Sequence, residues 1–302
     1  MESTYASSDV QRVSITVYSI TFILGIIGNG LVIWIAGFRM KKTISSVWFL
    51  NLAIADFLCC LSLPVTIADQ IMSYVCSSLS IIFFFLNNFM FHLNMSSSVL
   101  LLTAMSIDRW VSVMWPFWAK VHRTQKRVRI TAGIIWVMSF IWIGIVFTFS
   151  FYPICIDCNL ELILVLIRLF IMFVIPFLII VTSYVTIFFK ISNRPHRSQR
   201  PYRIVTAVIL CFFLCWAPYY ILIVAFFYQV SEVQHKILFT ISSCFPYFNS
   251  CINPIIYVIM GQDFRNSFLR SIPFRVEKAL SEHPDEPCEE PEAQEPPPST
   301  DI

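Results

Sequence analysis

The sequence predicts an all-α protein: a bundle of seven membrane-spanning helices with a short amphipathic helix after the seventh span. Of its 302 residues, 57% are hydrophobic and 13% are charged, whereas about a quarter of the residues of a soluble domain are charged. The charged residues are gathered between long apolar runs. This composition excludes an ordinary soluble domain and predicts a polytopic membrane protein.

Seven apolar runs give the number of spans, since about 20 apolar residues cross ~30 Å of hydrocarbon. Five runs contain no Asp, Glu, Lys or Arg, and they cover residues 13–38, 70–107, 130–156, 204–231 and 237–262. Two more, 43–68 and 162–189, are each interrupted by one charge, Asp56 and Arg168. We therefore expect a spanning domain over 13–261, preceded by a polar tail over 1–12.

Lys and Arg residues predict the orientation, because cytoplasmic loops carry the positive excess. Eighteen of the 21 flank the connections after spans one, three and five or follow span seven. The N-terminus is therefore predicted outside the cell and the C-terminus inside. The net charge of +3 describes a basic inner face and indicates no nucleic-acid partner.

Two segments are expected after span seven. Residues 262–275 place Phe264, Phe268 and Leu269 on one helical face, which predicts an amphipathic helix on the inner membrane surface. Residues 276–302 are rich in Pro and Glu and are predicted to be a disordered cytoplasmic tail.

No motif for enzyme chemistry is present. Most of the ten cysteines lie in apolar spans, where a thiol behaves as a small hydrophobe, and no pair has zinc-ligand context. A phosphate-binding loop and a nucleophile elbow are both missing. We therefore predict no enzyme activity. A channel or transporter is not indicated either, because no continuous charged pathway and no paired half-repeat is visible.

A polar group is expected in the middle of the bundle. Asp56 in span two is costly in hydrocarbon, so it must face the interior and find polar partners. Asn94 and Ser98 are four residues apart in span three, as are Asn249 and Asn253 in span seven, so each pair shares a helix face. A carboxylate ringed by such oxygens suits a small hard cation. The alternative is a purely structural hydrogen-bond network.

Kinks and charges at the inner end suggest a bistable bundle. Pro254, Pro218 and Pro176 interrupt spans seven, six and five, and their freed carbonyls need neighbouring partners. Asp108 and Arg109 close span three, where they form either a charge-pair switch or a positive-inside residue with its counter-ion.

These residues resemble the motif set of rhodopsin-like (class A) G-protein-coupled receptors, one motif per span and in order. The motifs are Gly28-Asn29, Leu52-Ala-Ile-Ala-Asp56, Asp108-Arg-Trp110, Trp136, Pro176 with Tyr184, Phe212 with Cys215-Trp-Ala-Pro218, and Asn253-Pro-Ile-Ile-Tyr257. The resemblance implies a multi-pass plasma-membrane receptor that binds an extracellular ligand and activates a heterotrimeric G protein, with arrestin as a further partner.

The resemblance also assigns roles to these positions. Sodium would be held by Asp56, Asn94, Ser98, Asn249 and Asn253, and no other cofactor is expected. Coupling and switching are assigned to Asp108, Arg109, Tyr184, Phe212, Trp216, Pro218, Asn253, Pro254 and Tyr257.

Within that class the chain is similar to the formyl peptide receptors of the chemoattractant group, which implies coupling to the inhibitory class of G protein. The stretches that carry the similarity are 29–40, 116–124, 248–254, 260–265 and 279–282. Span three departs from the family, because Phe84 stands where the family has a disulfide-bonded cysteine. Cys76 is left to pair with Cys155 or Cys158, or those two pair with each other, or all remain reduced.

The ligand positions depart as well. The family has an acid in span three and two arginines in span five, where this chain has His92, Leu164 and Arg168. Arg168 either anchors an anionic partner or extends to the outer interface. Asp69 and Glu161 make the outer mouth acidic. The predicted ligand-binding residues are Arg168, His92, Asp69, Glu161 and Trp216.

Two other interpretations remain open. The short second outer loop and the stretch 112–118 resemble the Mas-related receptors, which would imply cationic peptide ligands. The family's disulfide at span three is missing, and the N-terminal tail has no glycosylation sequon. Both features also fit a receptor-like protein that does not signal or stays inside the cell.

Overall fold

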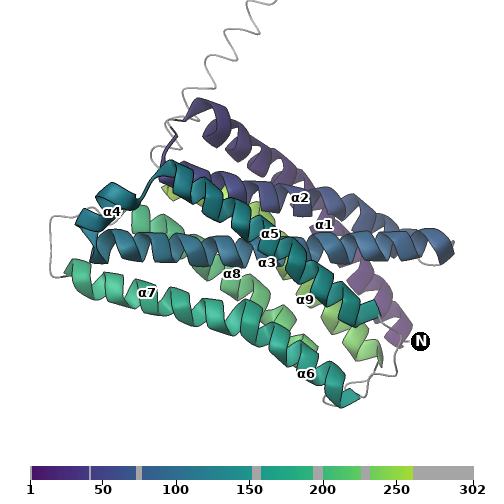
Figure 1. Ribbon diagram of the computed structural model, residues 1–302. Helices are drawn as coiled ribbons and strands as arrows, with labels where there is room; N and C mark the ends of the chain where they lie inside the picture. Colours follow the sequence, from purple (N-terminus) through teal and green to yellow (C-terminus); the bar gives the residue numbers. More distant parts are fainter. Residues whose placement is uncertain are drawn as a thin grey trace, which may run out of the picture.

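The computed structural model describes residues 2–40, 42–72, 77–151, 158–192, 200–225 and 232–260, and all regular structure in these ranges is helical. Long helices lie along one another as a bundle (Figure 1). The elements are α1 (Glu2–Trp34), η1 (Ile35–Arg39), α2 (Ile44–Met72), α3 (Ser77–Met114), α4 (Pro116–His122), α5 (Gln125–Phe151), α6 (Cys158–Leu169), η2 (Phe170–Val174), α7 (Ile175–Ser192), α8 (Arg200–Ala225) and α9 (Glu232–Met260).

Six helical segments of the described chain are long and apolar enough to cross a membrane. They lie in α1 with η1, in α2, in α3, in α5, in the continuous rod α6–η2–α7, and in α8. The seventh rod is α9, which has 29 residues. It is less apolar because it carries asparagines, serines and two prolines, and Asn249, Ser250 and Asn253 are buried inside the bundle.

Two predicted boundaries differ from the structure. Residues 2–12 form the first turns of α1 instead of preceding it, and this end of the bundle is tied to α2. It is called the outer end, and the opposite one the inner end, after the orientation that the sequence predicts. The Gln11 side-chain amide donates to the backbone carbonyl of Gln70 at 2.5 Å, and the Ser14 hydroxyl donates to the Gln70 side chain at 3.0 Å. The uncharged run 70–107 contains the end of α2 and most of α3. The predicted helix 262–275 and tail 276–302 lie outside the described residues.

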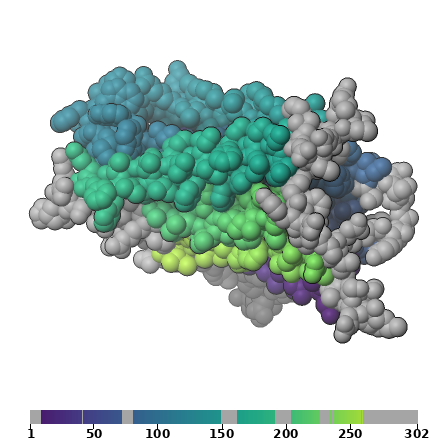
Figure 2. Space-filling model, turned by 90° about the horizontal axis from the view of Figure 1, so that it is seen from below, coloured from purple at the N-terminus to yellow at the C-terminus, as the bar shows by residue number. Residues whose placement is uncertain are grey.

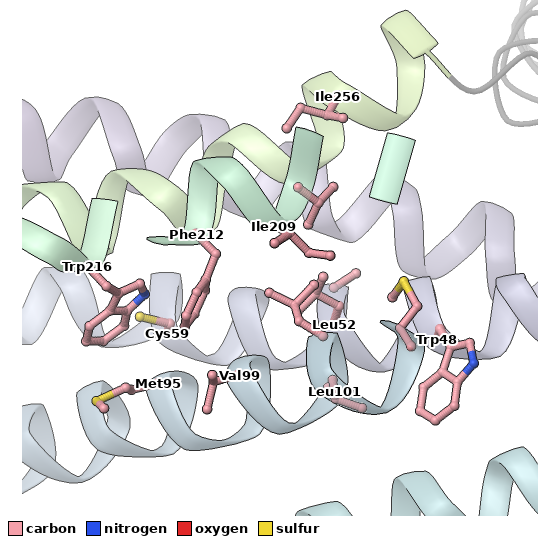
Figure 3. Packing of buried hydrophobic residues seen from close by; sticks show 14 of the residues in the cluster. Trp48, Leu52, Cys59, Met95, Val99, Leu101, Ile209, Phe212, Trp216 and Ile256 are labelled. Carbon is pink, nitrogen blue, oxygen red and sulfur yellow. The ribbon is translucent and has the colours of Figure 1, made fainter. Parts of the chain in front are cut away.

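The long helix α3 lies in the middle of the bundle and packs against α2, α5 and α7, while α9 packs against α1 and α8 (Figure 1). Figure 2 shows α7, α8 and α9 side by side along one face. In the core, Phe212 and Trp216 of α8 lie in one layer with Cys59 of α2 and with Met95 and Val99 of α3 (Figure 3).

Small residues let α1 approach its neighbours closely. A Cβ atom on Gly25 would stand 2.2 Å from the Cys60 sulfur of α2, and one on Gly28 would stand 3.0 Å from the Pro254 ring of α9. Such backbone approach is typical of packing between membrane helices. It brings the polar residues of α2 and α9 next to α1.

Span five contains an irregular turn at the place where Pro176 was predicted to interrupt the helix. The five residues of η2 form a π-helical turn, and α7 continues from Ile175. Pro176 has no N–H to donate to the carbonyl of Met172 in that turn, which favours local widening of the helix. Pro218 and Pro254 lie inside α8 and α9.

Candidate functional site

The structure brings the predicted polar residues of spans two, three and seven together at the centre of the bundle. Asp56 of α2 is completely buried. One carboxylate oxygen accepts a hydrogen bond from the Asn94 amide of α3 at 3.0 Å, and the other accepts one from the Asn253 amide of α9 at 2.7 Å. Asp56 therefore connects three helices through its two oxygens.

Several buried side-chain oxygens of Asn94 and Asn253, and of the residues one turn from them on the same helices, have no hydrogen-bond partner among the described residues. They are the side-chain oxygens of Asn94, Ser98, Asn249 and Asn253, and all four residues are buried. Buried polar atoms are ordinarily satisfied, so this cluster has unused acceptor capacity. One carboxylate with neutral oxygen donors is the ligand set that small hard cations prefer. The residues present therefore fit the predicted cation.

Neighbouring polar contacts fix the helices around this centre. The Asn29 amide of α1 donates to the Ser250 carbonyl of α9 at 2.7 Å. On the other side of α2, the Trp136 indole of α5 donates to the Asn51 side chain at 3.0 Å. Thus Asn29 and Trp136, both singled out from the sequence, connect their helices to neighbours. Asn51 was not singled out.

Toward the outer end, His92 of α3 and Arg168 of α6 lie near each other. The charge of Arg168 is close enough to act electrostatically on His92 and on Tyr219 and Tyr220 of α8. His92 is buried, and its Nδ1 atom has no hydrogen-bond partner among the described residues. Arg168 is half-buried, and no carboxylate of the described chain pairs with it.

An aromatic layer lies between this region and the polar centre. The ring of Phe91 in α3 contacts Trp216, Tyr219 and Tyr247, at centroid distances of 5.1, 5.0 and 5.5 Å. Trp216 in turn contacts Phe212 one turn further inward, at 5.8 Å. Rings from α3, α8 and α9 therefore form a continuous path from the neighbourhood of Arg168 toward the inside.

At the inner end, Asp108 has a partner that the sequence did not indicate. The Arg123 guanidinium donates to both oxygens of Asp108, at 2.7 and 2.6 Å. Arg109 donates to the Ser45 hydroxyl of α2 at 2.6 Å. Both carboxylate oxygens of Asp108 therefore contact Arg123, a more distant basic residue than its neighbour Arg109. In the sequence, Arg123 is one of the 18 basic residues that predict the orientation, and Ser45 gave no signal.

The remaining switch positions lie in the inner half of the bundle. Tyr257 is buried and its ring contacts Phe49 of α2 at 4.7 Å. Tyr184 packs against the core from α7. Pro254 is the residue of α9 that α1 approaches at Gly28.

Some predicted residues are only partly described. Asp69 is half-buried near the outer end of α2. Glu161 and Cys158 lie in the first turns of α6, but their side chains are outside the described part, as are Cys76 and Cys155 entirely. Phe84, at the family's cysteine position, is exposed on α3.

The family profile described as 7 transmembrane receptor (rhodopsin family) matches residues 28–257. The chain belongs to this family, and its members are signalling receptors, not enzymes. The predicted class is confirmed.

Similar proteins show to which group within this family the chain belongs. It is 36% identical to the C3a anaphylatoxin chemotactic receptor of Danio rerio over 300 residues, which cover 93% of this chain and 81% of that receptor. It is also 36% identical to Formyl peptide receptor 2 of Mus musculus, over 89% of this chain and 85% of the relative. Chemerin-like receptor 1 of Homo sapiens is 34% identical, over 89% and 80%. The chain is a G-protein-coupled receptor of the chemoattractant receptor family and a multi-pass membrane protein.

Proposed function

We propose that this receptor binds an extracellular peptide or small acid through a ligand carboxylate at Arg168 and activates a heterotrimeric G protein of the inhibitory class. The observation that carries the proposal is the Arg168 guanidinium, which is half-buried and has no carboxylate partner in the described chain. A cation within the membrane is stabilised by pairing with an anion. The carboxylate of a ligand can supply that anion reversibly, since the ligand binds and dissociates.

The surroundings of Arg168 favour an anionic ligand group with an apolar neighbour. His92 offers a buried ring nitrogen without a described partner. Tyr219 and Tyr220 contribute aromatic rings within electrostatic reach of Arg168. The planar guanidinium matches a carboxylate with two parallel hydrogen bonds, which a lysine cannot reproduce.

The aromatic path gives a route by which such a ligand acts on the inner face. A ligand that shifts Phe91 or Tyr219 must also displace Trp216, because these rings contact one another directly. Packed cores have discrete arrangements, so a shift at Trp216 favours a different position of α8. Movement of α8 then presents Arg109 to a helix of the G protein, with Asp108 held in place by Arg123.

We further propose that a sodium ion occupies the polar centre and favours the resting state. Asp56 would hold it together with the side-chain oxygens of Asn94, Ser98, Asn249 and Asn253, since those four oxygens lack described partners. The ion supplies a positive charge that neutralises Asp56 when bound. It shifts the conformational equilibrium only if it binds the resting arrangement more tightly.

The test is agonist potency in cells that express the full-length receptor at a measured surface level. A panel of formylated, unformylated and cationic peptides, each with a free or amidated C-terminus, is assayed for lowering of cyclic AMP. Arg168→Leu should weaken a carboxylate agonist by about 2–5 kcal/mol, and Arg168→Lys should recover only part of this. Arg129→Leu removes an arginine from the inner face and serves as the matched control.

Undiminished potency in Arg168→Leu would show that Arg168 does not anchor the ligand. Surface expression without any G-protein response across the panel would favour the non-signalling alternative. Activation by cationic peptides irrespective of C-terminal amidation would favour the Mas-related type of ligand.

A further inference from the structure

The short helix α4, between spans three and four, presents large apolar side chains outward. It begins at Pro116 directly after Trp115, and the exposed fractions of Phe117, Val121 and Trp118 are 88%, 70% and 52%. Ala119 on the opposite side is buried against the bundle. Large exposed apolar surfaces of this kind mark contacts with lipid or with another protein.

A cavity of about 340 Å³ lies beside this helix, and its described lining is Val111 of α3 with Trp115 and Trp118. All three lining side chains are apolar or aromatic. The lining residues are at the inner end of span three, where tryptophans are typical of the membrane interface. The cavity therefore lies at the depth where the acyl chains of the inner leaflet begin.

A basic residue is connected to the cavity wall through His122. The His122 ring stacks on Trp118 with ring centroids 4.6 Å apart and planes at 12°. The Arg127 guanidinium donates to the His122 backbone carbonyl at 3.0 Å and is otherwise exposed. Two direct contacts thus connect the cavity residue Trp118, through His122, to the exposed cation Arg127.

We propose that this cavity binds an anionic phospholipid of the inner leaflet, with an acyl chain against Trp115 and Trp118 and the headgroup phosphate at Arg127. The apolar lining matches the chain, and the guanidinium matches the phosphate. Exposed apolar side chains are also present on α5, the next helix along the chain, where Ile130 and Ile134 are 54% and 57% exposed. The inner leaflet is negatively charged, which adds attraction for basic residues near its surface.

The experiment uses the full-length receptor in nanodiscs of phosphatidylcholine, alone or mixed with phosphatidylserine. Retained lipids are counted by native mass spectrometry, and tryptophan quenching is measured with phosphatidylserine that carries brominated acyl chains. Arg127→Ala should lower the affinity for phosphatidylserine about fivefold. The matched control is Arg129→Ala, another exposed arginine of α5, whose described side-chain contact is to Gln125 of its own helix.

Val111→Phe, which reduces the cavity, should remove the retained lipid and the quenching while the receptor still binds its ligand. If that variant does not fold, Trp118→Phe should lower the brominated-lipid quenching in its place. Equal losses in Arg127→Ala and Arg129→Ala would overturn the proposal in favour of general surface attraction. It is also overturned if phosphatidylserine is retained no better than phosphatidylcholine, or if added G protein alone protects Trp118 from quenching.

Discussion

Replacing Arg123 by Ala tests the contact at the inner end that the sequence did not predict. The side chains of Arg123 and Asp108 are 22% and 10% exposed and share two short hydrogen bonds. Exposed ion pairs contribute at most ~1 kcal/mol, whereas removing one partner of a buried pair costs ~3–5 kcal/mol. Because this pair is mostly but not completely buried, we expect Arg123→Ala to cost about 2–3 kcal/mol.

The assay is the melting temperature of the purified receptor, which should fall by roughly 5–10 °C. Arg129→Ala is the control for loss of one positive charge on the inner face. A double-mutant cycle with Asp108→Ala isolates the pair, since the second substitution should cost little once the first partner is gone. The reasoning is refuted if Arg123→Ala melts no lower than Arg129→Ala, or if the two single effects simply add.

Three further predictions concern other parts of the bundle. Arg109→Ala should abolish G-protein nucleotide exchange with surface level and ligand binding intact, because it removes the proposed contact to the transducer; unchanged exchange would contradict this. Asp56→Asn should remove any sodium dependence of agonist affinity measured by radioligand competition, and an unmutated receptor whose affinity ignores sodium would make the centre purely structural. Gly25→Ala should lower stability by about 1–3 kcal/mol through overlap with the Cys60 sulfur. The added substitution Cys60→Ala should restore most of that loss, and a failure to do so would show that the overlap is relieved elsewhere.

The spans were predictable because hydropathy depends on local sequence. Each apolar run overlaps one long helix, although the run 70–107 also contains the end of α2. Asp56 contacts both Asn94 and Asn253, as their similar depths in the membrane predicted. Helix ends were less predictable. The polar residues before Val13 lie within α1 because Gln11 finds partners on α2, a contact that no pattern within the first helix contains.

Contacts between side chains of different helices depend on the tertiary structure. Asp108 lies directly before Arg109 in the sequence, yet both of its oxygens accept hydrogen bonds from Arg123, fifteen residues away. Successive residues on a helix point about 100° apart, so neighbours in sequence are poorly placed to pair. The short helix α4 returns the chain and places Arg123 beside Asp108 instead.

The sequence by itself determined which residues leave water and which face the interior, because these follow from the transfer free energy of each residue. The side of the membrane on which the basic loops lie stays a prediction from the distribution of Lys and Arg. Only the tertiary structure decided that the charge of Arg168 acts on His92 and that Arg127 contacts His122, whose ring stacks on the cavity residue Trp118. Those contacts join residues of different helices or loops. Their geometry depends on how the rods are rotated and packed, which no single run of residues specifies.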